Sequence, residues 1–344
     1  MNTFYLGIFL IIISGSFIGL FSTGVTLTSG WAFENIWGLG SLLALLLIPW
    51  PLALFTLNDV GEIFKTTDAK IMIITFLCGI GWGVGGIYWG KAIAAVGMAL
   101  GISLLTGLVN VFGSVGPMII YSPQTIITKG GIILIAAILV MIVGVLIISL
   151  AGKQKEKELS SDSENQSSQK KNVSLWIGLS YCIISGVLSA LVNIGFIYGT
   201  PIAESAINQG NVSWASGFAI WALIFTGNYL VNIIYSLALM VKNGSFQLYF
   251  KKSKTSYWLW ALFMGITWPA GIVLYGIAAN MMGEYGAYIG FPMMLLFSVV
   301  AGNLAGVFNG EWKGTGQKSR MLMITGILVL FTAFAFLSYA NKLL

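Results

Sequence analysis

The chain has 344 residues, and only 8% of them are Asp, Glu, Lys or Arg, whereas about 25% is usual for a soluble domain. Hydrophobic residues make up 57%, so too few polar side chains remain to cover water-soluble domains, and a soluble enzyme is excluded. The absence of His removes the commonest general base and metal ligand. Since Cys78 and Cys182 cannot build a Cys-rich metal site either, we expect no metal and no cofactor.

Ten apolar segments follow one another along the chain, each near the roughly 20 residues that a membrane-spanning helix needs. In chain order they are Thr3–Phe21, Ile36–Leu57, Ile71–Gly90, Val96–Tyr121, Gly131–Ala151, Val173–Tyr198, Trp214–Val241, Tyr257–Ala279, Tyr285–Phe308 and Met321–Tyr339. None alternates between apolar and polar residues, which argues against a transmembrane barrel. A helix is the other structure that satisfies its own backbone in lipid, so the predicted fold class is an all-α membrane protein with ten transmembrane helices.

A polar stretch divides the ten segments into two groups of five. Residues 153–172 are rich in Ser, Gln and Lys, which is typical of a disordered linker. We therefore predict a five-helix unit over residues 1–152 and a second one over residues 173–344, joined by this linker.

The basic residues are unevenly distributed among the loops. Of the 17 Lys and Arg residues, 13 lie in loops that follow odd-numbered segments. Cytoplasmic loops carry an excess of Lys and Arg, so we expect these loops in the cytoplasm and both termini outside. The net charge of +6 is then explained by anchoring at membrane lipids, and no nucleic-acid partner is expected.

The two halves resemble each other at their start. The pattern G-x4-I-I-S-G of residues 7–15 recurs at residues 178–186, which pairs Ser14 with Ser185. A single match of this kind arises easily by chance in apolar sequence, so it needs support from other segments.

Further matches occur in the third and fourth segments of each half, in the same order. Residues 85–97 match residues 271–283, and residues 97–113 share their Gly spacing with residues 286–302. Several ordered matches favour a duplication. Because five helices is an odd number, the second unit enters the membrane from the opposite side, which predicts an inverted repeat and alternating access to one central site.

Four motifs stand in order along the chain: ENIWGLGSLLALLLIPWP at residues 34–51, GWGVGGIYWG at 81–90, VGMALGISLLTGL at 96–108 and NGEWK at 309–313. Together they resemble the L-rhamnose/proton symporter family of the drug/metabolite transporter superfamily. The resemblance implies ten helices in two five-helix repeats. It also implies a multi-pass protein of the bacterial inner membrane that carries L-rhamnose or a similar deoxyhexose in symport with a proton.

Aromatic side chains in the third, eighth and ninth segments are candidate sugar contacts. A sugar stacks an apolar ring face on an aromatic ring, and its hydroxyl groups bond to a few polar groups set among apolar ones. The candidates are Trp82, Tyr88, Trp89, Trp268, Tyr275, Tyr285 and Tyr288. For Trp82 and Trp268, which lie well inside their segments, a place in the core is an equally good interpretation.

Two amides, Asn110 and Asn193, lie well inside the fourth and sixth segments. A polar group in hydrocarbon must find a partner. That partner is either a group on a neighbouring helix or a hydroxyl of the substrate, and both interpretations stay open.

None of the eleven acids lies at the middle of a predicted span. Proton-coupled transporters use a carboxylate in the membrane, and the best candidates for ion coupling are Glu284, at the start of the ninth segment, and Glu34, at the start of the second. The alternative is that each acid complements the dipole at a helix N-terminus.

These observations predict a secondary transporter that moves a small neutral sugar, with a proton or another cation, by alternating access. A cavity of aromatics and amides suits a sugar better than an organic cation, which would require an embedded carboxylate. The alternative is another carrier of the superfamily, for a nucleoside or ureide, or a metabolite exporter. The absence of His and of paired acids in the segments argues against a membrane enzyme, and the repeat argues against a purely structural protein.

Overall fold

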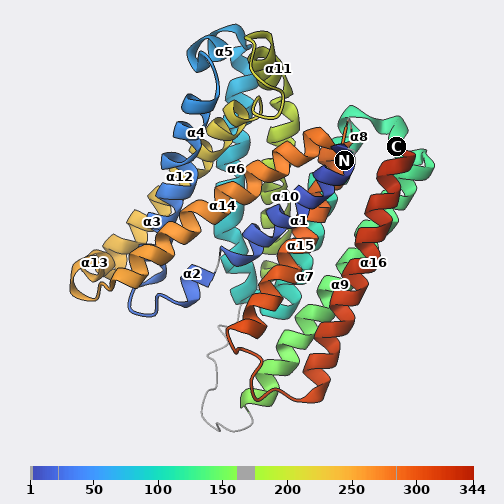
Figure 1. Ribbon diagram of the computed structural model, residues 1–344. Coiled ribbons are helices and arrows are strands. Elements are labelled where there is room, and N and C mark those ends of the chain that lie inside the picture. Colours follow the sequence, from blue (N-terminus) through green and yellow to red (C-terminus); the bar gives the residue numbers. More distant parts are fainter. Residues whose placement is uncertain (1–2, 22, 161–174, 284) are drawn as a thin grey trace.

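The computed structural model describes residues 3–21, 23–160, 175–283 and 285–344 (Figure 1). Within these residues there is no strand, and ten helices are long and apolar enough to cross a membrane. The predicted fold class, an all-α membrane protein with ten spans, is confirmed.

The first five spans contain two irregular turns. They are α1 (Thr3–Leu20); α3 (Phe33–Leu42) with the π-helical turn η1 (Leu43–Leu47) and α4 (Pro49–Thr56); α6 (Ala69–Val96); α7 (Met98–Asn110) with the π-helical turn η2 (Val111–Val115) and α8 (Gly116–Tyr121); and α9 (Lys129–Ser160). Between them lie α2 (Thr23–Thr26), α5 (Val60–Thr66) and the 3-10 turn η3 (Pro123–Ile127).

The second five spans are more regular. They are α10 (Leu175–Tyr198), continued by α11 (Thr200–Asn208), α12 (Phe218–Asn243), α14 (Thr255–Met281), α15 (Gly286–Phe308) and α16 (Gln317–Leu343). The 3-10 turn η4 (Ser245–Gln247) and α13 (Leu248–Lys251) connect α12 to α14.

Helix α9 extends through residues 153–160, which the sequence assigns to the linker. Glu158 stabilises this extension, because it accepts hydrogen bonds from Gln154 Nε2 at 3.0 Å, Gly316 N at 2.8 Å and Ser319 Oγ at 2.6 Å. The last turns of α9 are thus fastened to the start of α16. Residues 161–174 of the linker lie outside the described residues.

Both π-helical turns stand directly before a proline. In η1 the amide of Ile48 bonds to the carbonyl of Leu43, and Pro49 follows; Pro117 follows η2 by one residue. Proline lacks an N–H and its ring crowds the carbonyl four residues earlier, which favours a wider turn at that place. A wider turn relieves that crowding but leaves backbone carbonyls without an intrahelical partner. Helices α14 and α15, by contrast, continue through Pro269 and Pro292 as α-helices.

Helices of the two halves are interleaved rather than packed as separate units. Helix α1 packs against α14 and α15 of the second half, and α10 packs against α6 and α7 of the first half. Helix α3 packs against α12, and the long helices α9 and α16 form a pair at one side (Figure 1). We call α1, α14 and α15 the first bundle, and α6, α7 and α10 the second bundle.

Each bundle is fastened by one buried serine. Ser14 Oγ donates to the carbonyl oxygen of Gly271 at 2.6 Å, joining α1 to α14, and Ser185 Oγ donates to that of Gly85 at 2.8 Å, joining α10 to α6. The glycines permit this approach, since a Cβ at Gly85 would lie 2.7 Å from Ser189 N. The comparison of the two halves matches Ser14 with Ser185 and Gly271 with Gly85. The two hydrogen bonds therefore join corresponding pairs of residues in the two halves.

The glycines of α6 bring it into backbone contact with α12. A Cβ at Gly79 would lie 2.0 Å from the carbonyl oxygen of Ile224, and one at Gly227 would lie 2.3 Å from that of Phe76. Small residues allow helices to approach closely in this way, and α6 stays a continuous helix through its glycine cluster.

The described loops after the first, third, seventh and ninth spans gather at one end of the molecule (Figure 1). We call it the α13 end, and the opposite end, where α5 and α11 lie with the start of α1 and the end of α16, the α5–α11 end (Figure 1).

We expect Ser14→Ala and Ser185→Ala each to lower the free energy of unfolding by about 1 kcal/mol, because each removes one buried hydrogen bond between helices. Equilibrium unfolding with urea in detergent measures this. Ser16→Ala is the control, since Ser16 Oγ bonds to Ile12 O of its own helix and, among the described residues, to no other helix. An equal loss in Ser16→Ala would contradict the interpretation.

Gly79→Ala should destabilise the protein by about 1–3 kcal/mol, because the added methyl group has no room against the backbone of α12. In Gly86→Ala, on the same helix, a Cβ meets nothing within 4 Å, so stability should stay within error of the parent. Thermal unfolding of both variants in detergent separates close packing from a general intolerance of α6 to substitution.

Candidate functional site

Three tryptophans from three helices meet inside the bundle. The rings of Trp82 on α6 and Trp268 on α14 meet edge to face with centroids 5.9 Å apart. Trp268 also contacts Trp37 of α3 at 5.4 Å and stacks on Phe21, which follows α1, at 5.2 Å. We call Trp37, Trp82 and Trp268 the tryptophan cluster. It brings together two of the predicted sugar contacts from different halves of the chain.

Amides of α12 border the tryptophan cluster. Trp37 Nε1 donates to Asn232 Oδ1 at 2.6 Å, and Asn232 Nδ2 donates to Asn228 Oδ1 at 2.6 Å. Ser236 lies four residues after Asn232 on the same face of α12, and its buried Oγ has no hydrogen-bond partner among the described residues. Sequence reasoning missed Trp37, Asn228 and Asn232 as site residues. The spacing of four residues between the polar positions of α12 was the available signal, because such residues share a helix face.

Tyr88 and Trp89 lie apart from the tryptophan cluster. The Tyr88 ring is 5.6 Å from that of Tyr181, and Lys91 Nζ lies 4.9 Å above it. Trp89 packs against the apolar cluster that contains Cys182. Both side chains therefore serve the contact between α6 and α10 in this conformation.

Asn193 and Tyr275 are bonded to each other. The Tyr275 hydroxyl donates to Asn193 Oδ1, and it lies 3.1 Å from the carbonyl oxygen of Ala287. Asn193 Nδ2 donates to the carbonyl oxygens of Gly113, at 2.6 Å, and Ala287, at 3.3 Å. Asn193 and Tyr275 are almost completely buried, so this network joins α10, η2, α14 and α15 out of contact with solvent.

The need for an amide at this place follows from Pro117. Proline has no N–H that could donate to the carbonyl of Gly113, which lies four residues earlier within the fourth span. A carbonyl without a partner is costly in an apolar environment, and Asn193 supplies the missing donor.

Four predicted site residues remain, namely Tyr285, Tyr288, Asn110 and Glu284. Tyr285 and Tyr288 stand at the start of α15 with ring centroids 6.2 Å apart. Asn110 Nδ2 bonds to Thr106 O of its own helix, and Asn110 Oδ1 is buried without a partner among the described residues. Glu284 lies outside the described residues.

Glu34 is buried at the α13 end, in the first turn of α3. Its Oε1 accepts hydrogen bonds from Ser245 Oγ at 2.6 Å and Asn243 Nδ2 at 2.9 Å, while Asn35 Nδ2 donates to Ser245 O at 3.1 Å. The Tyr249 hydroxyl donates to Asn35 O at 2.7 Å, and burial, with a contribution from Glu34, raises the pKa of Tyr249 to about 12. These contacts fasten the start of α3 to the loop after α12.

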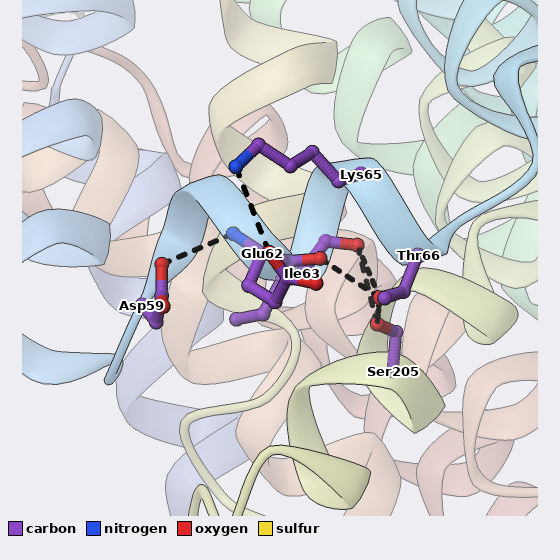
Figure 2. Close-up of polar contacts among 6 residues, drawn as sticks. All are labelled: Asp59, Glu62, Ile63, Lys65, Thr66 and Ser205. Carbon is purple, nitrogen blue, oxygen red and sulfur yellow. Dashed lines mark hydrogen bonds and ion pairs between the residues drawn. The ribbon is translucent and has the colours of Figure 1, made fainter.

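At the α5–α11 end a second set of contacts joins the loop after α4 to the segment between α11 and α12. Asn58 N donates to Asn211 Oδ1 at 2.6 Å, and Asn211 Nδ2 returns a bond to Asn58 O at 3.2 Å. Figure 2 shows the neighbouring contact, where the hydroxyls of Thr66 and Ser205 lie 2.7 Å apart and Ser205 also donates to Ile63 O. We call the contact of α3 and α4 with α12 the α3–α12 seam. Hydrogen bonds thus close this seam at both ends.

Comparison with known proteins gives the family. The model of the L-rhamnose-proton symport protein (RhaT) family matches residues 1–340. L-rhamnose-proton symporters of Mannheimia succiniciproducens and Klebsiella pneumoniae are each 25% identical to this chain, covering 95% of both sequences. The L-rhamnose-proton symporter of Pectobacterium atrosepticum is 25% identical, with 96% of both sequences covered.

This is a family of symport proteins and not of enzymes, and the ten spans make this chain a multi-pass membrane protein. Since its model covers almost the whole chain, this protein belongs to the L-rhamnose-proton symport protein (RhaT) family.

Proposed function

We propose that this protein carries L-rhamnose or a similar deoxyhexose across the bacterial inner membrane together with a proton, by alternating access. The match of the symporter family to residues 1–340 carries the proposal. The relatives named above are L-rhamnose-proton symporters, and they align over nearly their whole lengths.

The tryptophan cluster is the proposed sugar site. Its rings offer apolar faces for the ring of a sugar, and the amide of Asn232, bonded to Trp37, offers a polar group beside them. The described Asp and Glu side chains lie at the ends of spans or in loops. One helical turn before Trp37, the buried carboxylate of Glu34 already accepts hydrogen bonds from Ser245 and Asn243. A carboxylate engaged in this way favours a neutral solute over an organic cation.

Alternating access is supported by the way the helices are interleaved. Each bundle contains helices of both halves of the chain and is fastened by a matched serine bond. In an inverted repeat, the two halves can exchange conformations, which opens the central site first to one side and then to the other. The distribution of basic residues favours a cytoplasmic α13 end and termini on the outside.

Glu34 and Glu284 are the proposed residues for proton coupling. Glu34 is buried beside the α3–α12 seam, and its carboxylate is held by neutral donors rather than by a cation. A proton is therefore a suitable partner for its charge when the seam rearranges. A nucleoside or ureide carrier, or a metabolite exporter, is the competing function, because the same superfamily fold serves several solutes.

Uptake of labelled L-rhamnose into proteoliposomes tests the proposal. We expect accumulation only with an inward proton gradient, and Trp268→Ala should raise the KM about tenfold because one stacking surface is lost. Trp176→Ala, at an exposed ring of α10, should leave the KM unchanged. No accumulation by folded protein would reject L-rhamnose and direct the search to nucleosides and ureides.

Glu34→Gln tests the coupling role. The substitution keeps an oxygen that can accept from Ser245 and Asn243 but removes the titratable group. We expect gradient-driven accumulation to fall to the level reached without a gradient, whereas exchange of labelled for unlabelled sugar continues. Glu62→Gln on α5, whose side chain is 42% exposed, is the matched control and should keep full accumulation. If Glu34→Gln still accumulates sugar, the same assay on Glu284→Gln decides the remaining candidate.

A further inference from the structure

The contact between Asn193 and Tyr275 crosses from one bundle to the other. Asn193 lies on α10 and Gly113 lies in η2 beside α7, which places both in the second bundle. Tyr275 on α14 and Ala287 on α15 belong to the first bundle. We call these side chains and the two carbonyl oxygens the cross-bundle contact. It lies toward the α5–α11 end, because α10 leads into α11 and α15 begins there (Figure 1).

The matched positions of the other half do not carry the same chemistry. The match of the third segments pairs Tyr275 with Trp89, whose indole has no acceptor and packs in an apolar cluster. The spacing between Ser14 and Ser185 places residue 22 opposite Asn193, and residue 22 lies outside the described residues.

A cavity of about 70 Å³ lies at the α13 end, between the α1–α2 region and the end of α15. The match of the fourth segments pairs Gly113 with Gly302, and Gly302 borders this cavity together with Gly19 and Thr23 of the α1–α2 region. At one end of the molecule, therefore, the ring of Phe291 fills the space beside Gly113, and Asn193 bonds to the carbonyl of this glycine. At the other end, the matching glycine borders open space.

When two inverted repeats exchange conformations, the serine bonds and the cross-bundle contact behave differently. The two serine bonds replace each other when the halves exchange roles, so both persist in both states. When the halves exchange roles, Tyr275 takes the surroundings that the matched Trp89 has in this conformation, an apolar cluster, so its bond to Asn193 breaks. We propose that Asn193 and Tyr275 form the gate of the α5–α11 end, closed in this conformation and opened when the transporter admits solute from that side. This rests on the proposed alternating access, but not on the identity of the solute.

A thiol beside the gate reports its opening. Ser114 is fully buried in η2 beside Gly113, and its Oγ has no partner among the described residues, so Ser114→Cys is a mild change. The reporter is placed in a Cys78→Ala, Cys182→Ala background, since these are the two cysteines of the chain. Labelling with a membrane-impermeant maleimide from the α5–α11 side, in vesicles without sugar, measures how often the thiol is reached.

Tyr275→Phe should increase the labelling rate of this thiol about tenfold, because it removes a buried hydroxyl that stabilises only the closed state. Asn193→Leu should increase it at least as much. Ser185→Ala is the matched control, because it removes a buried hydrogen bond of the same helix within one bundle, and it should leave the rate unchanged while lowering stability.

An unchanged rate in Tyr275→Phe would overturn the gate, and so would an equal increase in Ser185→Ala, which would indicate general loosening. If Asn193→Leu fails to fold, Tyr275→Phe alone decides, because it keeps the aromatic ring. The assay contains no sugar, so failure of L-rhamnose uptake together with faster labelling would reject the substrate and keep the gate.

Discussion

The structure depends on one constraint: inside a membrane, every backbone carbonyl and amide must find its partner within the protein. Helices meet this requirement except where proline removes an N–H. Beside Pro117, Asn193 bonds to the carbonyl of Gly113, and beside Pro201 the hydroxyl of Thr200 bonds to that of Ile197. The buried contact between Asn193 and Gly113 thus originates as the repair of an interrupted helix.

In the proposed transport cycle, buried hydrogen bonds between helices determine which helices move together. The serine bonds, of which Ser14 to Gly271 is one, lie within bundles, whereas Tyr275 to Asn193 lies between them. Because apolar packing in a membrane has no strong directional preference, the proposal assigns to these directional bonds which contacts persist and which open. The tryptophan cluster lies where helices of both bundles meet α3, which is where a shared solute site is expected.

Part of the site could be predicted from residue types alone. Aromatic and amide residues inside apolar segments are unusual enough to single out Trp82, Trp268, Asn193 and Tyr275. Their grouping could not be predicted, because it depends on which helix faces meet. Tyr88 has the same residue type and sequence context as the others, yet it faces Tyr181. Trp37 was overlooked because nothing in its own segment indicates that it faces an amide of α12.

The amino-acid sequence by itself determined the membrane class, the ten spans, their division by a polar stretch and the family, because these follow from composition, segment length and ordered motifs. The tertiary structure alone decided how the spans pair. Helices such as α1 are apolar around their whole circumference, so no hydrophobic stripe indicates which face meets a neighbour. Only close approach at glycines and the geometry of a few hydrogen bonds place α1 against α14 and α10 against α6.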